Sequence, residues 1–150
     1  MNATEINEIL RRHCGEMFIG VFAKDRLPTK LPRRPALMVV NTDRANQPGT
    51  HWVAMFFDDD GTGEYFDSFG ETAEETFALY MNKHCTRWIF SERQLQSVVS
   101  RFCGHHVVFY ALYRSIGYNL NAITSWFSSD MTLNDVMTHE FVCRRIRKTM

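Results

Sequence analysis

The sequence lacks the features that would send a protein through or onto a membrane. Its first residues read MNATEINEIL, without the basic segment and apolar run of a secretory signal. No stretch approaches the roughly 18 consecutive apolar residues of a membrane span. Net charge is also absent, because 17 basic and 17 acidic side chains cancel, so no overall positive field attracts nucleic acid or an acidic membrane. We therefore expect a soluble, intracellular protein.

Closely spaced cysteines are also missing. Cys14, Cys85, Cys103 and Cys143 are scattered, with no C-x2-C or H-x3-H spacing among the cysteines and histidines. A zinc site usually needs such spacing, and a disulfide framework needs an oxidising compartment. We expect four free thiols and no metal site. Structural zinc is the minor alternative, because histidine and cysteine stand side by side at three places.

The composition is that of a folded domain. With 150 residues, 45% of them hydrophobic and 23% charged, the chain can bury a core of its own, so we expect residues 1–150 to form a single domain. Helix patterns and strand patterns occur together, which predicts an α+β fold with a central sheet. The expected helices are 2–13, 72–82, 103–116 and one from 132, and the expected strands are 36–41, 51–57, 64–69 and 87–90.

Side chains at helix ends refine these expectations. Asn2 and Glu5 match a capping box, and Gly15 is a suitable stop for the first helix. Thr132 and Asp135 match the cap of a last helix. The apolar face of that last helix is expected to contain Leu133, Val136, Met137 and Phe141.

A histidine and an aspartate flank the expected hairpin. Strands 51–57 and 64–69 surround the turn cluster DDDGTG. In an antiparallel pair this places His51 within about 10 Å of Asp67. An imidazole beside a carboxylate is the oriented base of a catalytic triad. The alternative is a surface histidine near a solvated aspartate.

Cys103 precedes Gly104 at the start of an apolar helix. Free N–H groups and the helix dipole lower the pKa of a thiol there, and a nearby histidine increases the thiolate fraction. Gly104 leaves room for a substrate backbone. The alternative is a buried structural cysteine.

Two glutamines compete for the role of oxyanion donor. Gln96 lies seven residues before Cys103, and a side-chain amide together with the nucleophile N–H can stabilise a tetrahedral oxyanion. Gln94 is close enough in sequence to confound the assignment, and either glutamine could instead be a surface residue.

The order of these motifs carries a family resemblance. The chain contains His51-Trp52, Asp67-Ser68-Phe69-Gly70, Gln96 and Cys103-Gly104 in this order. The pattern resembles the adenovirus-type cysteine proteases (adenain), which also occur in Maverick/Polinton transposons and related DNA viruses, and more distantly the SUMO-specific proteases. The resemblance covers about residues 1–117. It includes N-terminal matches at Cys14-Gly15, Phe18, Gly20, Asp25, Val40-Asn41-Thr42 and Gly49-Thr50.

The resemblance implies a cysteine endopeptidase with a central mixed β-sheet flanked by helices and a papain-like arrangement of nucleophile and base. Cys103 would be the nucleophile, and His51 the general base and then acid. Asp67 would orient the imidazole, where adenain has Glu and the SUMO-protease relatives have Asp. Gln96 and the Cys103 N–H would hold the oxyanion. The chemistry requires no cofactor. The implied substrates are capsid and core precursors, often cut near glycine during virion maturation, in the virion and the host nucleus or cytoplasm.

The resemblance also implies two activators. Adenain forms a disulfide with a viral peptide through a cysteine upstream of its glutamine, and Cys85 has a similar place here. Adenain also uses DNA as a cofactor, whereas this chain concentrates positive charge only at Arg33-Arg34 and in residues 144–148. The alternatives are a protease specific for SUMO or other ubiquitin-like proteins, and a non-catalytic binding module that retains the fold. We expect a monomer.

Overall fold

A five-stranded mixed sheet forms the centre of the protein. The computed structural model describes residues 1–46 and 51–149, with side chains described up to residue 146. The sheet has the order β1-β2-β3-β4-β5. The pairs β1–β2 and β4–β5 are parallel, and the pairs β2–β3 and β3–β4 are antiparallel. The strands are β1 (Phe18–Ala23), β2 (Ala36–Asn41), β3 (Trp52–Phe57), β4 (Thr62–Phe66) and β5 (Arg87–Phe90).

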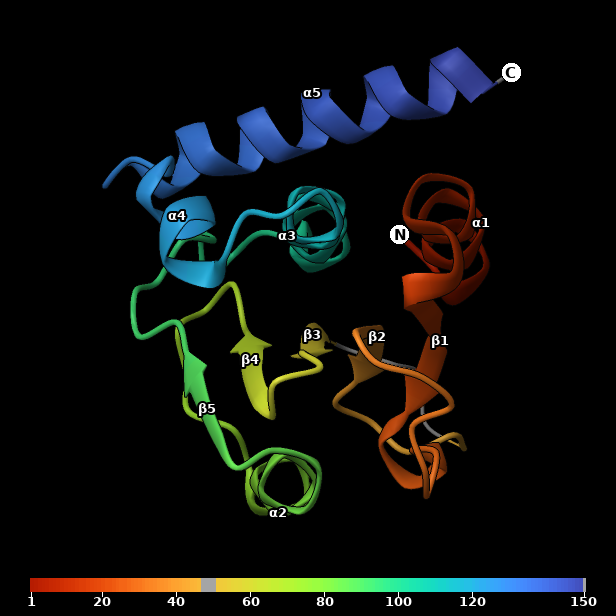
Figure 1. Ribbon diagram of the computed structural model, residues 1–150. Helices are drawn as coiled ribbons and strands as arrows, with labels where there is room; N and C mark the ends of the chain where they lie inside the picture. The colour runs from red at the N-terminus through yellow and green to blue at the C-terminus, as the bar shows by residue number, and fades with distance from the viewer. Residues whose placement is uncertain (47–50, 150) are drawn as a thin grey trace.

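Helices cover both faces of this sheet. Figure 1 shows α1, α3, α4 and α5 on one side of the sheet and α2 on the other. The α+β fold with a central mixed sheet flanked by helices is therefore confirmed. The four helices are α1 (Ala3–Cys14), α3 (Cys103–Ser115), α4 (Leu120–Ser125) and α5 (Met131–Thr149), and α2 spans Glu75–His84.

Strand β3 explains why the sequence is apolar at every position around residues 52–57. Its side chains alternate between the two faces: Ala54 and Phe56 join the core beneath α1 and α3, whereas Met55 and Phe57 join the core beneath α2. Both faces of the strand are covered, so neither face needs polar side chains.

Helix α3 lies between the sheet and α5 (Figure 1). It is buried nearly all round, as expected of a helix that is apolar on every side. Tyr110 stacks on Phe66 of β4, with ring centroids 4.7 Å apart, and donates a 2.6 Å hydrogen bond to the buried carboxylate of Glu64. These contacts fix the helix, and therefore Cys103 at its first position, over the centre of the sheet.

The predicted first helix is confirmed in detail. Asn2 accepts a hydrogen bond from the Glu5 backbone N–H, and the Glu5 side chain accepts one from the Asn2 N–H. Gly15 ends the helix with a φ of 62°, a conformation that favours glycine. Strand β1 and helix α4 were not predicted. Gly20 interrupts the apolar pattern of β1, and α4 has only six residues.

The prediction for the last helix is wrong in two respects. Its cap is Asp130, whose side chain accepts from the Leu133 N–H, whereas Asp135 is buried against His106. Leu133 and Val136 are 56% and 52% exposed. The helix instead buries the polar residues Asn134, Asp135 and Thr138 beside Met137 and Phe141. Asn134 donates to the Leu95 carbonyl, Asp135 pairs with His106 of α3, and the Thr138 hydroxyl donates to backbone carbonyls of α5 itself.

Some predicted features lie outside the described residues. These are residues 47–49 of the loop that the segment ANQPG (45–49) predicts, the Gly49-Thr50 part of the family resemblance, and the side chains of Arg147 and Lys148 in the basic cluster. Strand β4 also ends at Phe66, three residues before the predicted end. The Asp67 side chain accepts the Phe69 N–H there and turns the chain out of the sheet.

Candidate active site

The predicted proximity of His51 and Asp67 is confirmed. His51 immediately precedes β3 and Asp67 immediately follows β4, and the antiparallel pairing of these strands brings the two positions together. Nε2 of His51 lies 2.8 Å from Oδ1 of Asp67. Both side chains are largely buried, at 14% and 7% exposed, so the pair is shielded from bulk water.

Two further contacts fix the orientation of this pair. Oδ1 of Asp67 also accepts the backbone N–H of Phe69 at 2.8 Å, which holds the carboxylate against the turn. The Phe69 ring stacks on the imidazole, with centroids 4.6 Å apart and planes 26° apart. The imidazole is therefore held at its edge by a carboxylate and on its face by an aromatic ring.

Cys103 is the first residue of α3, and its thiol is largely buried. No side chain caps this helix N-terminus. Burial by itself raises the pKa of Cys103, but the neighbouring His51 imidazole and the Trp52 and Gly104 backbone outweigh burial and lower it below the usual value. The site therefore favours the thiolate.

The His51 imidazole responds in the opposite sense. Burial lowers its pKa, but hydrogen bonding and charge from Asp67 and Cys103 raise the pKa to about 9. Asp67 occupies Nε2, and Nδ1 is buried without a well-directed hydrogen bond to any described residue. Nδ1 is thus the ring nitrogen available to the neighbouring thiol.

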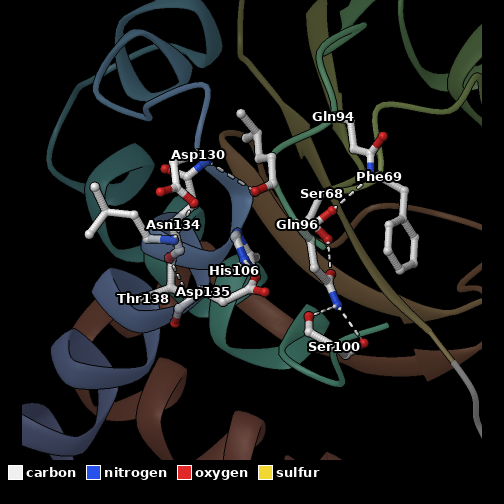
Figure 2. A network of polar contacts seen from close by, with 12 residues as sticks. Ser68, Phe69, Gln94, Gln96, Ser100, His106, Asp130, Asn134, Asp135 and Thr138 are labelled. Atoms are coloured by element: carbon white, nitrogen blue, oxygen red, sulfur yellow. Dashed lines mark hydrogen bonds and ion pairs between the residues drawn. The ribbon is translucent and has the colours of Figure 1, made fainter. Parts of the chain in front are cut away.

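Gln96, rather than Gln94, directs its amide toward the segment that leads into Cys103. Figure 2 shows the Gln96 side chain between Ser68 and Ser100. Its Oε1 accepts from the Ser68 hydroxyl at 2.5 Å, and its Nε2 lies 3.1 Å from the Ser100 carbonyl oxygen and 3.0 Å from the Ser100 hydroxyl. Gln94 donates instead to the backbone carbonyl of Gln96 at 3.0 Å.

A pocket of about 360 Å³ is lined in part by His51, Asp67 and Phe69, and another of about 360 Å³ is lined in part by Trp52 and Met1. The Trp52 indole donates to the Met1 carbonyl at 3.1 Å. A Cβ at Gly104 would lie 2.9 Å from Cβ of Met1 and 3.5 Å from the indole. Gly104 therefore permits the close approach of this chain's own Met1 next to Cys103. The room that Gly104 is expected to leave for a substrate backbone stays a prediction.

Cys85 is not part of this cluster. It follows α2, the helix on the opposite face of the sheet from α3, and packs with the core beneath α2. Its sulfur packs so closely on Gly63 that a Cβ at residue 63 would clash with it, and burial raises the pKa of the thiol. Cys85 is therefore a half-buried and weakly nucleophilic thiol remote from the nucleophile helix.

The described residues 1–46 and 51–149 contain no group of three or more His, Cys, Asp or Glu side chains placed to hold a metal ion. No helix in the same part of the chain is long and apolar enough to cross a membrane.

Sequence reasoning missed two residues that shape this site. Phe69 stacks on the imidazole, and the buried Ser68 hydroxyl holds the Gln96 amide. Both lie in the Asp67–Gly70 turn, so the only available signal was their position next to the candidate aspartate. Which face each side chain takes is set by the turn geometry.

Solved structures share this fold. The ASFV pS273R protease matches in two structures, with TM-scores of 0.65 and 0.62 at 20% and 21% identity, covering 92% and 93% of this chain. The chain spans 66% of the length of that viral protease. The central domain of the uncharacterised Lpg1148 protein from Legionella pneumophila matches with a TM-score of 0.58 at 9% identity, covering 98% of each chain.

At the level of sequence families, residues 18–139 match the adenovirus endoprotease family. This range runs from β1 into the first half of α5, and so it contains His51, Asp67, Gln96 and Cys103 together. It also extends beyond residue 117, where the motifs end. The chain belongs to the adenovirus endoprotease family, a family of cysteine peptidases.

Proposed function

We propose that the protein is a thiol endopeptidase in which Cys103 attacks the scissile carbonyl carbon. His51 accepts the thiol proton at Nδ1, and the sulfur forms a bond to the carbon as the carbonyl electron pair moves to oxygen. The imidazolium then donates that proton to the leaving amine as the C–N bond breaks, which yields a thioester. Water, deprotonated by His51, hydrolyses the thioester and regenerates the thiol.

The other two residues act on orientation and charge. Asp67 holds Nε2 of His51, so that Nδ1 faces the sulfur and the imidazolium is stabilised after proton transfer. The Gln96 amide and the Cys103 backbone N–H stabilise the oxyanion that develops on the carbonyl oxygen. The carboxamide must release or share its contact with the Ser100 hydroxyl to do so.

One observation carries this proposal. The 2.8 Å His51–Asp67 contact orients an imidazole that lies beside a thiol at the N-terminus of a helix. The pKa of the imidazole is raised and the pKa of the thiol is lowered, so each group favours the charged form of the other. A surface histidine near a solvated aspartate or an ordinary buried cysteine would not show both shifts.

The substrates we propose are capsid or core precursor proteins of a virus or transposon, cut near glycine during maturation. Family membership supports this class. We propose that the protein acts as a monomer, folded as one domain over residues 1–150, in the virion and in the host nucleus or cytoplasm. Cysteine peptidases carry out this reaction with the protein's own groups, without a cofactor.

The test is cleavage of a fluorogenic peptide pool with glycine on the acyl side of the scissile bond. Wild type should cleave it, Cys103→Ala should not, and the matched control Cys143→Ala should behave as wild type, because Cys143 lies on α5. Equal cleavage by wild type and Cys103→Ala would refute the proposal.

A second probe distinguishes the substrate class. Covalent labelling of Cys103 by a ubiquitin-like protein with an electrophilic C-terminus, without cleavage of the peptide pool, would assign the site to a ubiquitin-like-protein-specific protease. Absence of both reactions, with a thiol reactivity like that of free cysteine, would indicate a non-catalytic binding module.

We extend the proposal to the two family activators. A peptide that carries its cysteine in a disulfide with a small thiol would react with Cys85 by exchange: the Cys85 sulfur would attack the peptide sulfur, and the small thiol would leave with the Cys85 proton. Because the Cys85 sulfur is half-buried, the peptide would have to displace part of its cover. Activation by such a peptide should vanish in Cys85→Ser and persist in Cys14→Ser.

Duplex DNA is the second activator that we propose. Arg33 already contacts Glu16, and Arg34 donates to the carbonyl oxygens of Asp58 and His84, so little of this cluster is free for phosphate. If duplex DNA does not stimulate peptide cleavage at low salt, DNA is not an activator of this protein.

A further inference from the structure

Ser68 is a buried serine whose hydroxyl contacts the proposed oxyanion donor. Its side chain is fully enclosed, and the hydroxyl donates to Oε1 of Gln96 at 2.5 Å. The backbone carbonyl of Ser68 accepts two further hydrogen bonds, from the N–H groups of Leu95 at 2.8 Å and Gln96 at 2.9 Å. One residue thus holds Gln96 both by its peptide and by its side chain (Figure 2).

These contacts determine which end of the Gln96 amide points toward Ser100, three residues before Cys103. A carboxamide can rotate and exchange its oxygen for its nitrogen, and an oxygen facing the developing oxyanion would repel it. Because Ser68 donates to Oε1, Nε2 is directed to the opposite side, where it meets Ser100 ahead of Cys103. The hydroxyl therefore selects the productive orientation.

The same turn also supports the histidine. Asp67, the residue before Ser68, holds Nε2 of His51, and Phe69, the residue after it, stacks on the imidazole. Gly70 closes the turn at a φ of 71° against the backbone of Arg93. Adjacent residues of one turn thus support the base and the oxyanion donor.

We propose that Ser68 is a positioning residue for catalysis, a proposal that rests on the proposed function. Its hydroxyl orients the Gln96 carboxamide so that an N–H faces the oxyanion, and Ser68 itself does not touch the substrate. Because Ser68 acts through Gln96, the effect of its hydroxyl on kcat should disappear when residue 96 cannot donate a hydrogen bond.

The test uses Ser68→Ala, with Ser91→Ala as the matched control. Ser91 is also buried in this region, but its hydroxyl contacts the Asp67 carbonyl at 3.4 Å and not Gln96. On the fluorogenic glycine peptides, Ser68→Ala should lose about 10- to 100-fold in kcat with KM nearly unchanged, somewhat less than the loss of an oxyanion donor. Ser91→Ala should stay within about threefold of wild type.

A double variant distinguishes positioning from simple destabilisation. Gln96→Ala should lose about 10²- to 10³-fold in kcat, and adding Ser68→Ala to it should cause less than about a twofold further loss. A further loss of tenfold, or equal losses in Ser68→Ala and Ser91→Ala, would overturn the proposal. If Ser68→Ala does not fold, Ser68→Cys carries the test, because it fills a similar space with a weak donor.

Alkylation of Cys103 by iodoacetamide separates this proposal from the proposed function. The reaction needs the thiolate but forms no tetrahedral oxyanion, so Ser68→Ala should be alkylated as fast as wild type while its hydrolysis is impaired. If His51→Ala alkylates and hydrolyses like wild type, the proposed function fails. If His51→Ala is impaired but Ser68→Ala hydrolyses normally, only the role of Ser68 fails.

Discussion

Two histidine–aspartate pairs in this molecule have nearly the same geometry and opposite acid–base behaviour. Nε2 of His51 lies 2.8 Å from Asp67, and Nε2 of His106 lies 2.9 Å from Asp135. Nδ1 of each ring is buried without a well-directed hydrogen bond to a described residue. Yet the pKa of His51 is raised to about 9, whereas the pKa of His106 is lowered.

The difference comes from what surrounds each ring. Burial lowers both pKa values, and a single carboxylate does not overcome it at His106, which is fully enclosed and stacks on Phe127. At His51 a second acidic neighbour, the Cys103 thiol, adds to the effect of Asp67. At His51 the carboxylate and the thiol together outweigh a less complete burial, whereas at His106 the carboxylate alone does not outweigh full burial.

The two pairs also differ in what they join. His51 and Asp67 lie at the ends of neighbouring strands of the sheet, next to the nucleophile. His106 lies on α3, three residues after Cys103, and Asp135 lies on α5, so this buried pair ties the nucleophile helix to the last helix (Figure 2). We interpret the first pair as catalytic and the second as structural.

The largest expected effect separates the two histidines by activity. His51→Ala should lower kcat/KM by roughly 10³-fold or more, because the thiolate loses its base and its counter-ion. His106→Ala should lower the kcat/KM of the folded fraction by less than about tenfold. Cleavage of glycine peptides, normalised to titrated Cys103, measures both, and equal losses would contradict the distinction.

The aspartates should follow the same division. Asp67→Asn preserves the shape of the side chain but favours the wrong imidazole tautomer, so kcat should fall by roughly 10²- to 10⁴-fold. Asp135→Asn should leave kcat within about tenfold. A smaller activity loss in Asp67→Asn than in Asp135→Asn would show that the structural pair, and not the hairpin pair, supports the base.

For stability we expect the opposite order: the His106 variant should lose more free energy of unfolding than the His51 variant. His106→Ala leaves the Asp135 carboxylate buried without its histidine partner, and we expect the free energy of unfolding to fall by about 3–5 kcal/mol. His51→Ala should cost less, about 1–3 kcal/mol, because the Asp67 carboxylate keeps the Phe69 N–H as a partner. Urea unfolding measures both values. The double variant His106→Ala with Asp135→Ala should regain part of the loss, because it removes the unpartnered charge.

The pH dependence of stability should have opposite signs at the two histidines. Because the pKa of His51 is raised to about 9 in the folded protein, the protonated imidazole stabilises the fold. This stabilisation is complete below about pH 6.5 and is lost as the pH rises through about 9. Because the pKa of His106 is lowered in the folded protein, the fold favours the neutral imidazole. This stabilisation is present above about pH 6.5 and is lost as the pH falls. Urea unfolding of each alanine variant against wild type from pH 5 to 10 checks both signs, and parallel curves would contradict them.

Much of the site could be predicted from short-range patterns. The hairpin followed from the turn cluster between two apolar runs, and the hairpin placed His51 near Asp67 because antiparallel strands bring distant residues together. The burial of α3 followed from its apolar composition on every side. These inferences need only local periodicity and strand geometry.

The C-terminal third could not be predicted in the same way. Asp135 was assigned to a helix cap because capping aspartates and buried aspartates look alike in a sequence. The helix buries Asn134 and Asp135 because Leu95 and His106, which are 39 and 29 residues away, supply their hydrogen-bond partners. Such long-range pairing leaves no local pattern. It also makes the expected apolar face wrong at Leu133 and Val136.

By itself, the sequence determined the fold class, the hairpin that joins base and carboxylate, and the start of the nucleophile helix at Cys103, because strand and helix periodicity and turn chemistry are local. Only the tertiary structure showed that the Gln96 amide contacts Ser68 and Ser100 while the Gln94 amide donates to the Gln96 carbonyl. It also placed Cys85 on the far side of the sheet from α3 and distinguished two histidine–aspartate pairs of nearly equal length. The pKa of a buried imidazole depends on how much water is excluded and which charges surround it. Those neighbours come from segments far apart in the chain.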